Sequence, residues 1–249
     1  MIAVPTLEVP LDSLESAVLA APYADRLELC DDLASEGWSP TEALVRSVRA
    51  AVETELVVMV RPRLSGADTS LTAAGFAATA RVIDACRADI EMAARAGAES
   101  VAIALLTRDG FVDMEACGQL AACARAASLE VAFLRAFDLL KDRERGMRNI
   151  CALGVQRVVT AGVMGWDASV TPLERRLEVL EVDTAQARRF ATPSSAPVEV
   201  VAGGGVRWSN ALDFLAISPH LHASCRRDGA ISREELEALR EQMSGSPRP

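Results

Sequence analysis

The chain has 249 residues, of which half are apolar and only 4% are aromatic, and its formal net charge is −9. A chain of this length buries roughly three-quarters of its unfolded surface, so a core of Ala, Val, Leu and Ile needs no disulfide or metal to support it. The excess of carboxylates argues against a nucleic-acid partner, because such partners select for clustered Lys and Arg.

The start of the chain does not have the pattern of an export signal. The first 21 residues lack a basic leading segment and carry Glu8, Asp12 and Glu15. No uncharged apolar run approaches the ~20 residues that a membrane helix needs. We therefore expect a cytoplasmic protein with no membrane partner and with six reduced cysteines. The cysteine spacings are unlike CxxC, so they indicate neither a zinc site nor a redox site.

Short apolar runs rich in Val and Leu alternate with longer segments of helical period. This alternation is typical of a parallel sheet covered by helices, and α/β barrels of this length commonly form one domain. Eight strands are predicted, each followed by a helical segment: Leu7–Leu11, Arg26–Cys30, Leu56–Arg61, Ser100–Leu106, Glu130–Arg135, Gln156–Thr160, Val198–Ala202 and His220–Ala223.

The ends of the helical segments carry capping signals. Ser39-Pro40-Thr41-Glu42 combines a cap, a first-turn proline and an early carboxylate, which predicts a helix start. Gly97 and Gly154 each follow a helical stretch and precede a strand, as a left-handed C-terminal cap requires. These signals set the boundaries of the repeating units.

Two helical segments are unusually long. For the Ala-rich stretch from Thr72 to Ala98 we predict an extended helix with a break near Asp84 to Arg87. The stretch from Thr171 to Ala196 is expected to end at the prolines of Thr192-Pro193-Ser194-Ser195-Ala196-Pro197. The last residues, Ser244 to Pro249, are expected to be disordered.

Several stretches taken in order resemble the CutC family. They are Leu7-Glu8-Val9 with Asp12-Ser13-Leu14-Glu15-Ser16-Ala17, Ala24-Asp25-Arg26-Leu27-Glu28-Leu29-Cys30, Met59-Val60-Arg61-Pro62-Arg63, Leu106-Thr107-Arg108-Asp109-Gly110, Arg135-Ala136-Phe137-Asp138, Thr160-Ala161-Gly162, Gly203-Gly204-Gly205-Val206 and His222-Ala223-Ser224. No single stretch is specific, and the signal lies in their order between Leu7 and Cys225.

The resemblance implies an α/β fold of the (β/α)8 TIM-barrel type in a single domain. It places the barrel in residues 1–225, with residues 226–249 as a C-terminal helix and a disordered tail appended to the same domain. It also implies a cytoplasmic location, self-association as a homodimer or higher homo-oligomer, and a role in copper homeostasis with copper ion binding. No nucleotide cofactor is indicated.

The chain departs from the family pattern where a metal needs ligands. Three positions that carry His or Cys in the family are occupied here by Val57, Leu134 and Pro10. Cu(I) favours thiolate and thioether ligands and also accepts imidazole. Cys30 is therefore the leading candidate ligand for Cu(I), with Met59 and His222 beside it.

In a TIM barrel the functional face is formed by the C-terminal ends of the strands, so polar residues late in each strand are the candidates. The predicted catalytic residues are Glu8, Glu28, Arg61, Arg135, Asp138 and His222, and the predicted ligand-binding residues are Arg63, Thr160, Gly203 and Gly204. Strand side chains two positions apart share a face. We therefore expect Glu28 and Cys30, and likewise Met59, Arg61 and Arg63, to point into the barrel mouth.

The charged cluster supports an alternative function. Arginine forks bind carboxylate or phosphate, which predicts a small anionic ligand and a TIM-barrel enzyme of the lyase, isomerase or hydrolase type acting on a small anionic or phosphorylated metabolite. Glu28 or Asp138 is then the acid or base, and His222 also suits that role. The residues from Gly203 to Gly205 either bind phosphate through backbone N–H groups or form a tight turn with positive φ.

A third hypothesis is a closed salt-bridge network in a non-catalytic dimer. In either functional case Trp166, in a Gly-rich loop, is the best candidate for a lid over the mouth.

Overall fold

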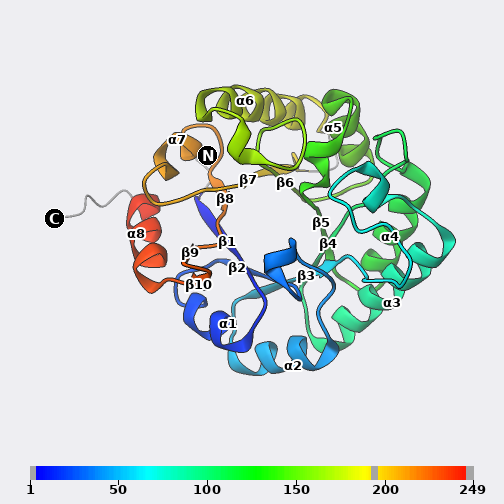
Figure 1. Ribbon diagram of the computed structural model, residues 1–249, viewed down its shortest axis with the longest axis horizontal. Helices are drawn as coiled ribbons and strands as arrows, with labels where there is room; N and C mark the ends of the chain where they lie inside the picture. Colours follow the sequence, from blue (N-terminus) through cyan, green and yellow to red (C-terminus); the bar gives the residue numbers. More distant parts are fainter. Residues whose placement is uncertain (1–3, 192–195, 245–249) are drawn as a thin grey trace.

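The computed structural model describes residues 4–191 and 196–244, which form a closed barrel of eight parallel strands (Figure 1). In order around the barrel the strands are β1 Thr6–Leu11, β2 Arg26–Leu29, β3 Glu55–Val60, β4 Ser100–Ile103, β5 Glu130–Phe133, β6 Arg157–Thr160, β7 Glu199–Ala202 and β8 His220–His222. The barrel closes where β1 pairs with β8 and places Glu8 opposite His222. The predicted single (β/α)8 barrel is confirmed.

The helices form a ring around the barrel (Figure 1). They are α1 Leu14–Ala20, α2 Glu42–Ala51, α3 Ala80–Ala96, α4 Met114–Ala126, α5 Arg143–Ala152, α6 Leu173–Arg189, α7 Ala211–Leu215 and α8 Arg233–Ser244. Helix α8 packs against both α7 and α1 and so completes the ring. The boundary predicted after residue 225 thus lies between β8 and α8, which both belong to the barrel. A division of the chain at this position stays a prediction.

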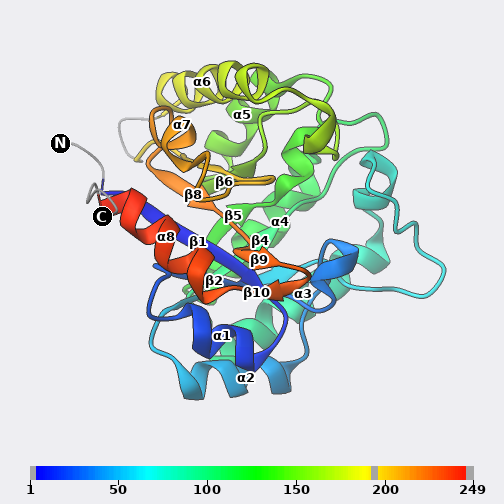
Figure 2. The ribbon, with the colours of Figure 1, turned by 60° about the vertical axis from the view of Figure 1, so that its left-hand side comes forward.

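Short elements follow several strands at the C-terminal end of the barrel. Four 3-10 turns, η1 Leu33–Ser35, η2 Ala73–Phe76, η3 Arg135–Leu139 and η4 Ala168–Val170, follow strands at their C-terminal ends. A hairpin of β9 Arg226–Arg227 and β10 Ala230–Ile231 precedes α8. Figure 2 shows the long cyan loop between β3 and α3 projecting away from the barrel. These loops supply the residues that surround the mouth.

The apolar runs form strands because both of their faces are covered. Each strand contacts helices outside and other strand side chains inside, as the continuous Val and Leu runs require. The interior is not entirely apolar, since Glu8, Arg26 and Arg157 are each less than a tenth exposed. Such charges are tolerated because Glu8 and Arg26 pair with each other, and Arg157 pairs with Glu55 and Glu130 at the N-terminal ends of β3 and β5.

The capping signals place the helices largely as predicted. Thr41 caps α2 and accepts a hydrogen bond from the Leu44 N–H, so Pro40 precedes the cap and does not lie in the first turn as predicted, whereas Glu42 does. Gly97 and Gly154 adopt φ values of 91° and 69°, so both predicted left-handed helix ends are confirmed.

The predicted break within the long Ala-rich segment is wrong in its position. Helix α3 runs without interruption through Asp84 to Arg87, and the break lies earlier, between η2 and α3. There Ala77 pairs with Leu106 in an isolated bridge, and Thr79 caps α3 by accepting from the Val82 N–H. The chain is extended at this point because it adds an edge contact to the segment after β4.

The other long helix, α6, ends at Arg189. The turn predicted over residues 192–195 and the disorder predicted over residues 245–249 lie outside the described residues. Of the helices described, none is both long and apolar enough to cross a bilayer.

Candidate functional site at the mouth of the barrel

A cavity opens at the C-terminal ends of the strands. Its walls are Pro10, Glu28, Met59, Arg61, Leu134, Arg135, Val159 and His222, and Leu33, Glu36, Phe76 and Trp166 lie over it. The wall residues come from β1, β2, β3, β6 and β8 and from the segments after β3 and β5. Parallel strands all end at the same rim, so four of the predicted site residues, Glu28, Arg61, Arg135 and His222, converge here.

Glu8, which is buried, pairs with His222, which is partly buried in the wall of the cavity. The Nδ1 of His222 lies 2.8 Å from Glu8 Oε1, and Arg26 Nε donates to the other carboxylate oxygen at 3.1 Å. Burial opposes ionisation of Glu8, but the hydrogen bond from His222 and the charges of His222 and Arg26 lower its pKa to about 2. Glu8 is thus a fixed anion that orients the imidazole.

Glu28 is the second carboxyl group of the site and is in a very different state. It is 2% exposed, and its Oε2 is buried with no hydrogen-bond partner in the described chain. Burial raises the pKa of Glu28 to about 7; the charge of His222 opposes this shift and the charge of Glu8 adds to it. Glu8 is therefore ionised at neutral pH, whereas Glu28 gains or loses its proton in this range.

His222 connects the two carboxyl groups. Burial alone favours its neutral form, yet the hydrogen bond to Glu8 and the charges of Glu28 and Glu8 raise the pKa of His222 above its ordinary value. One ligand atom from each of the three residues lies within 4.8 Å of the others. This group is the only set of His, Cys, Asp and Glu side chains in the described part of the chain with spacing suited to a metal ion.

Arg61 forms one side of the cavity. Its guanidinium stacks over Trp38 at 4.2 Å and over Phe76 at 4.8 Å, measured to the ring centres. It donates to the carbonyl oxygens of Gly37 and Thr69. Burial lowers the pKa of Arg61. The aromatic faces hold this cation in place, the charge of Glu36 favours it, and no ion pair joins it to another of the described residues.

Arg135 and Trp166 form another part of the lining of the cavity. Arg135 Nη2 donates to the Trp166 carbonyl at 2.6 Å, and its guanidinium lies 4.8 Å from the centre of the indole ring. Trp166 stacks on Phe76 with ring centres 5.7 Å apart. The two stacked rings lie across the cavity, which supports the prediction of Trp166 as a lid and adds Phe76 to it.

Asp138 and Thr160 lie outside the mouth cavity. Asp138 is fully buried and accepts hydrogen bonds from Thr160 Oγ1 at 2.6 Å, from the Ala161 N–H at 2.9 Å and from Arg143. Thr160 in turn accepts from Arg143 and from the Gly162 N–H. Each of these polar groups has a hydrogen-bond partner. Asp138, Thr160 and Arg143 therefore form a closed network of the kind that the third hypothesis predicts.

Gly203 and Gly204 form a turn packed against its neighbours. The Gly203 N–H donates to the Thr160 carbonyl, and its own carbonyl accepts from Arg176. Gly204 has φ 72°, and a Cβ atom at this position would overlap the Cβ of Ala161. The geometry matches the tight-turn alternative, and the predicted binding role of these glycines stays a prediction.

Cys30 and Arg63 also lie outside the cavity, contrary to the expectation that they share it with Glu28 and Met59. Cys30 follows the end of β2, and its buried Sγ donates to the Leu11 carbonyl at 3.5 Å. Burial and the charge of Glu28 raise the pKa of this thiol far above its ordinary value. Arg63 is half exposed and pairs with Asp32 at 2.6 Å.

Sequence reasoning missed three contributors to these sites. Arg26 pairs with Glu8, Phe76 forms part of the cover, and Arg143 neutralises Asp138. Arg26 was visible as a charge at the start of a predicted strand, two positions before Glu28 and on the same face. Phe76 and Arg143 carry no local signal, because their roles depend on where a long loop and a helix fold back.

The fold and its mouth together define a (β/α)8-barrel protein with a buried His and carboxylate group at the functional end. The chain matches the model of the CutC family over residues 5–226, and it belongs to that family. The family resemblance predicted from the ordered stretches is thus confirmed.

Similar proteins carry copper-related names. The chain is 34% identical over 230 residues to a human protein named copper homeostasis protein cutC homolog, covering 90% of this chain and 76% of that protein. It is 34% identical over 223 residues to a CutC family protein of Histophilus somni, covering 88% and 82%. The crystal structure of a CutC protein from Streptococcus agalactiae matches with a TM-score of 0.73 at 21% identity, over 88% of this chain and 98% of that one, and this likeness shows the fold.

Proposed function

We propose that the protein acts in copper homeostasis in the cytoplasm by binding a copper ion at the mouth group of Glu8, Glu28 and His222. The names of the relatives support the copper role. The observation that carries the site is the convergence of these three side chains within 4.8 Å. Imidazole and carboxylate donors suit divalent metals, and Cu²⁺ binds such sites more tightly than the other first-row divalent ions.

The donor set fits a divalent ion better than Cu(I). Metal-binding histidines commonly donate one ring N–H to a carboxylate, which fixes the tautomer and leaves the other nitrogen for the ion. The contact of His222 Nδ1 with Glu8 has this form. Glu28 and His222 would then hold the ion, with Glu8 orienting the imidazole. Cys30 does not fit, because its thiol is buried against a backbone carbonyl.

Binding is expected to depend on pH through Glu28. A metal displaces the proton from a carboxyl ligand, so affinity rises with pH until that ligand is ionised. The pKa of Glu28 is about 7 and that of His222 is raised above its ordinary value, so copper affinity should increase with pH through neutrality until both ligands have lost their protons.

The test is a calorimetric copper titration of the wild type and three variants. Glu28→Gln should abolish stoichiometric Cu²⁺ binding, whereas Cys30→Ser and the exposed cavity-rim control Glu36→Gln should leave it intact. A parallel Cu(I) titration under reducing conditions tests whether Cys30 binds Cu(I), as the sequence predicts. Retention of copper by Glu28→Gln together with loss in Cys30→Ser would reject the mouth group as the copper site.

A second candidate function is acid–base catalysis on a small anionic molecule in the same cavity. It is favoured by the unpartnered carboxyl of Glu28, whose pKa of about 7 suits proton transfer at neutral pH. Arg61 and Arg135 line the same cavity, and guanidinium groups favour an anion over a bare cation; Arg135 also pairs with Asp138 at 3.4 Å, whereas Arg61 has no ion pair among the described residues.

Replacing one cavity arginine with an uncharged residue distinguishes copper binding from the binding of an anionic substrate. Arg135→Gln removes a positive charge from the cavity, so it should strengthen copper binding if a cation is the cargo. The same change should weaken the binding of acetate or inorganic phosphate if an anion is the ligand. Self-association as a homo-oligomer stays a prediction that sedimentation equilibrium tests.

A further inference from the structure

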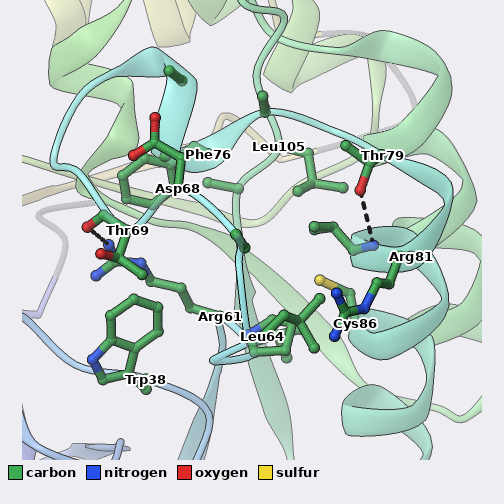
Figure 3. Close-up of a pocket in the computed structure, with 18 of the residues that line it drawn as sticks. Trp38, Arg61, Leu64, Asp68, Thr69, Phe76, Thr79, Arg81, Cys86 and Leu105 are labelled. Carbon is green, nitrogen blue, oxygen red and sulfur yellow. Dashed lines mark hydrogen bonds between the residues drawn. The ribbon is translucent and has the colours of Figure 1, made fainter.

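A second cavity of about 280 Å³ lies beside the mouth, between the loop after β3 and the N-terminal end of α3 (Figure 3). We call it the side pocket. Its apolar walls include Trp38, Leu64, Phe76, Val82 and Leu105, and its basic residues are Arg61, Arg81 and Arg108. Arg61 and Phe76 also line the mouth cavity, so they form a shared wall between the two.

The side pocket has an excess of positive charge although the chain as a whole is acidic. Its lining contains three arginines and one carboxylate, Asp68, whose Oδ1 accepts from the Ser70 N–H at 2.8 Å. Arg81 donates to the Ser65 carbonyl. Arg108 forms no hydrogen bond or ion pair with any residue that the structure describes. Within the described residues, none of the three arginines is neutralised by an ion pair.

Arg61 is the buried member of this set. It is 7% exposed, and its Nε atom is buried with no hydrogen-bond partner among the residues described. Figure 3 shows its side chain between the rings of Trp38 and Phe76, with Arg81 across the pocket at α3. Arg61 forms no ion pair among the described residues, and the charge of Glu36 offsets only part of its burial, so a bound anion would stabilise this cation further.

The N-terminal end of α3 adds a fourth source of positive potential. This helix has 17 residues, no acidic residue in its first turn and Arg81 in its place. Helix N-termini carry a partial positive charge, so a first-turn arginine is repelled by it. Thr79, Arg81 and Val82 of this helix end line the pocket, where an anion would be attracted by both the arginine and the helix.

We propose that the side pocket binds a small organic anion. Its phosphate, sulfonate or carboxylate group contacts Arg61, Arg81, Arg108 and the N-terminal end of α3, and its apolar portion packs against Leu64, Phe76 and Leu105. This site does not depend on the function proposed for the mouth. Because Arg61 and Phe76 wall both cavities, an occupant of the side pocket contacts residues that also shape the mouth.

Phenyl phosphate is a suitable probe because it joins a dianion to an apolar ring. Isothermal titration should show binding of phenyl phosphate and none of phenol. Arg81→Gln and Arg108→Gln should each weaken binding roughly tenfold, as expected for loss of a charge-assisted hydrogen bond. Arg95→Gln is the matched control, since it removes the same charge from the exposed far end of α3.

Both test residues are exposed at the rim, so the variants are expected to fold. The proposal is overturned if phenyl phosphate, benzenesulfonate and benzoate all fail to bind at millimolar concentration, or if phenol binds as well as phenyl phosphate. It is equally overturned if the Arg81 and Arg108 variants match the Arg95 control while Arg135→Gln abolishes binding, because the probe then occupies the mouth.

Discussion

Replacing Glu28 with glutamine removes a buried carboxyl group while keeping its shape. In the folded protein this group is 2% exposed, and burial raises its pKa to about 7 from 4.5 in the unfolded chain. The folded state therefore holds the proton more tightly than the unfolded state does. The contribution of Glu28 to the free energy of unfolding is therefore fully present below pH 4.5, and it is lost as the pH rises through 7.

The size of the effect follows from the two pKa values. Ionising Glu28 in the folded protein costs about 3 kcal/mol relative to the unfolded chain. Glutamine has no such cost, so Glu28→Gln should be more stable than the wild type by up to about 3 kcal/mol at pH 8 and nearly equal to it at pH 4. For a chain of this size, the difference at pH 8 corresponds to a rise in Tm of roughly 6 to 12 °C.

Urea unfolding followed by far-ultraviolet circular dichroism at pH 4, 6 and 8 measures this difference. Glu36→Gln is the control, because it makes the same chemical change at an exposed position over the same cavity. A Glu28→Gln variant that is no more stable than the wild type at pH 8 would refute the reasoning. It would mean that the charged carboxylate is stabilised in the folded protein by a partner or an ion.

Three further predictions concern neighbouring positions. Glu8→Gln should lower the free energy of unfolding at pH 7 by about 3 kcal/mol, because the wild-type carboxylate has a pKa of about 2 in place of 4.5; urea titrations should show this difference disappear as the pH falls through 2. Asp138→Asn should lower the free energy of unfolding by about 3 kcal/mol, since it removes the buried carboxylate that pairs with Arg135 and Arg143, of which only Arg143 keeps a second carboxylate partner, Asp183; an unchanged Tm would contradict this. Gly204→Ala should destabilise more than Gly205→Ala in thermal unfolding: both have positive φ, but only the first would meet a neighbouring side chain.

The fold and much of the mouth were predictable because they follow from short-range patterns. Apolar runs alternating with helical segments specify parallel strands, and strand polarity brings the C-terminal ends together. Glu28, Arg61, Arg135 and His222 therefore reached the mouth as predicted. The position of the break before α3 was not predictable, because it depends on a bridge from Ala77 to a distant strand end.

The protonation states and contacts of the site residues were not predictable from the sequence. Two glutamates at similar places on adjacent strands have pKa values of about 2 and about 7, since only Glu8 contacts His222 and Arg26. Likewise Asp138 looked equivalent to the other carboxylates until its buried partners were known. Cys30 looked like a ligand, yet its thiol is turned to a backbone carbonyl.

The sequence by itself predicted eight strands alternating with helices from its periodicity. The order of its motifs gave the resemblance to the CutC family, which in turn implied the closed barrel with charged residues at one end. Only the tertiary structure decided which carboxyl is ionised, which arginines have no ion pair among the described residues and which rings cover the mouth. The pairing of Glu8 with His222 joins residues 214 positions apart. Burial and charge at such contacts depend on packing in three dimensions, which no local pattern encodes.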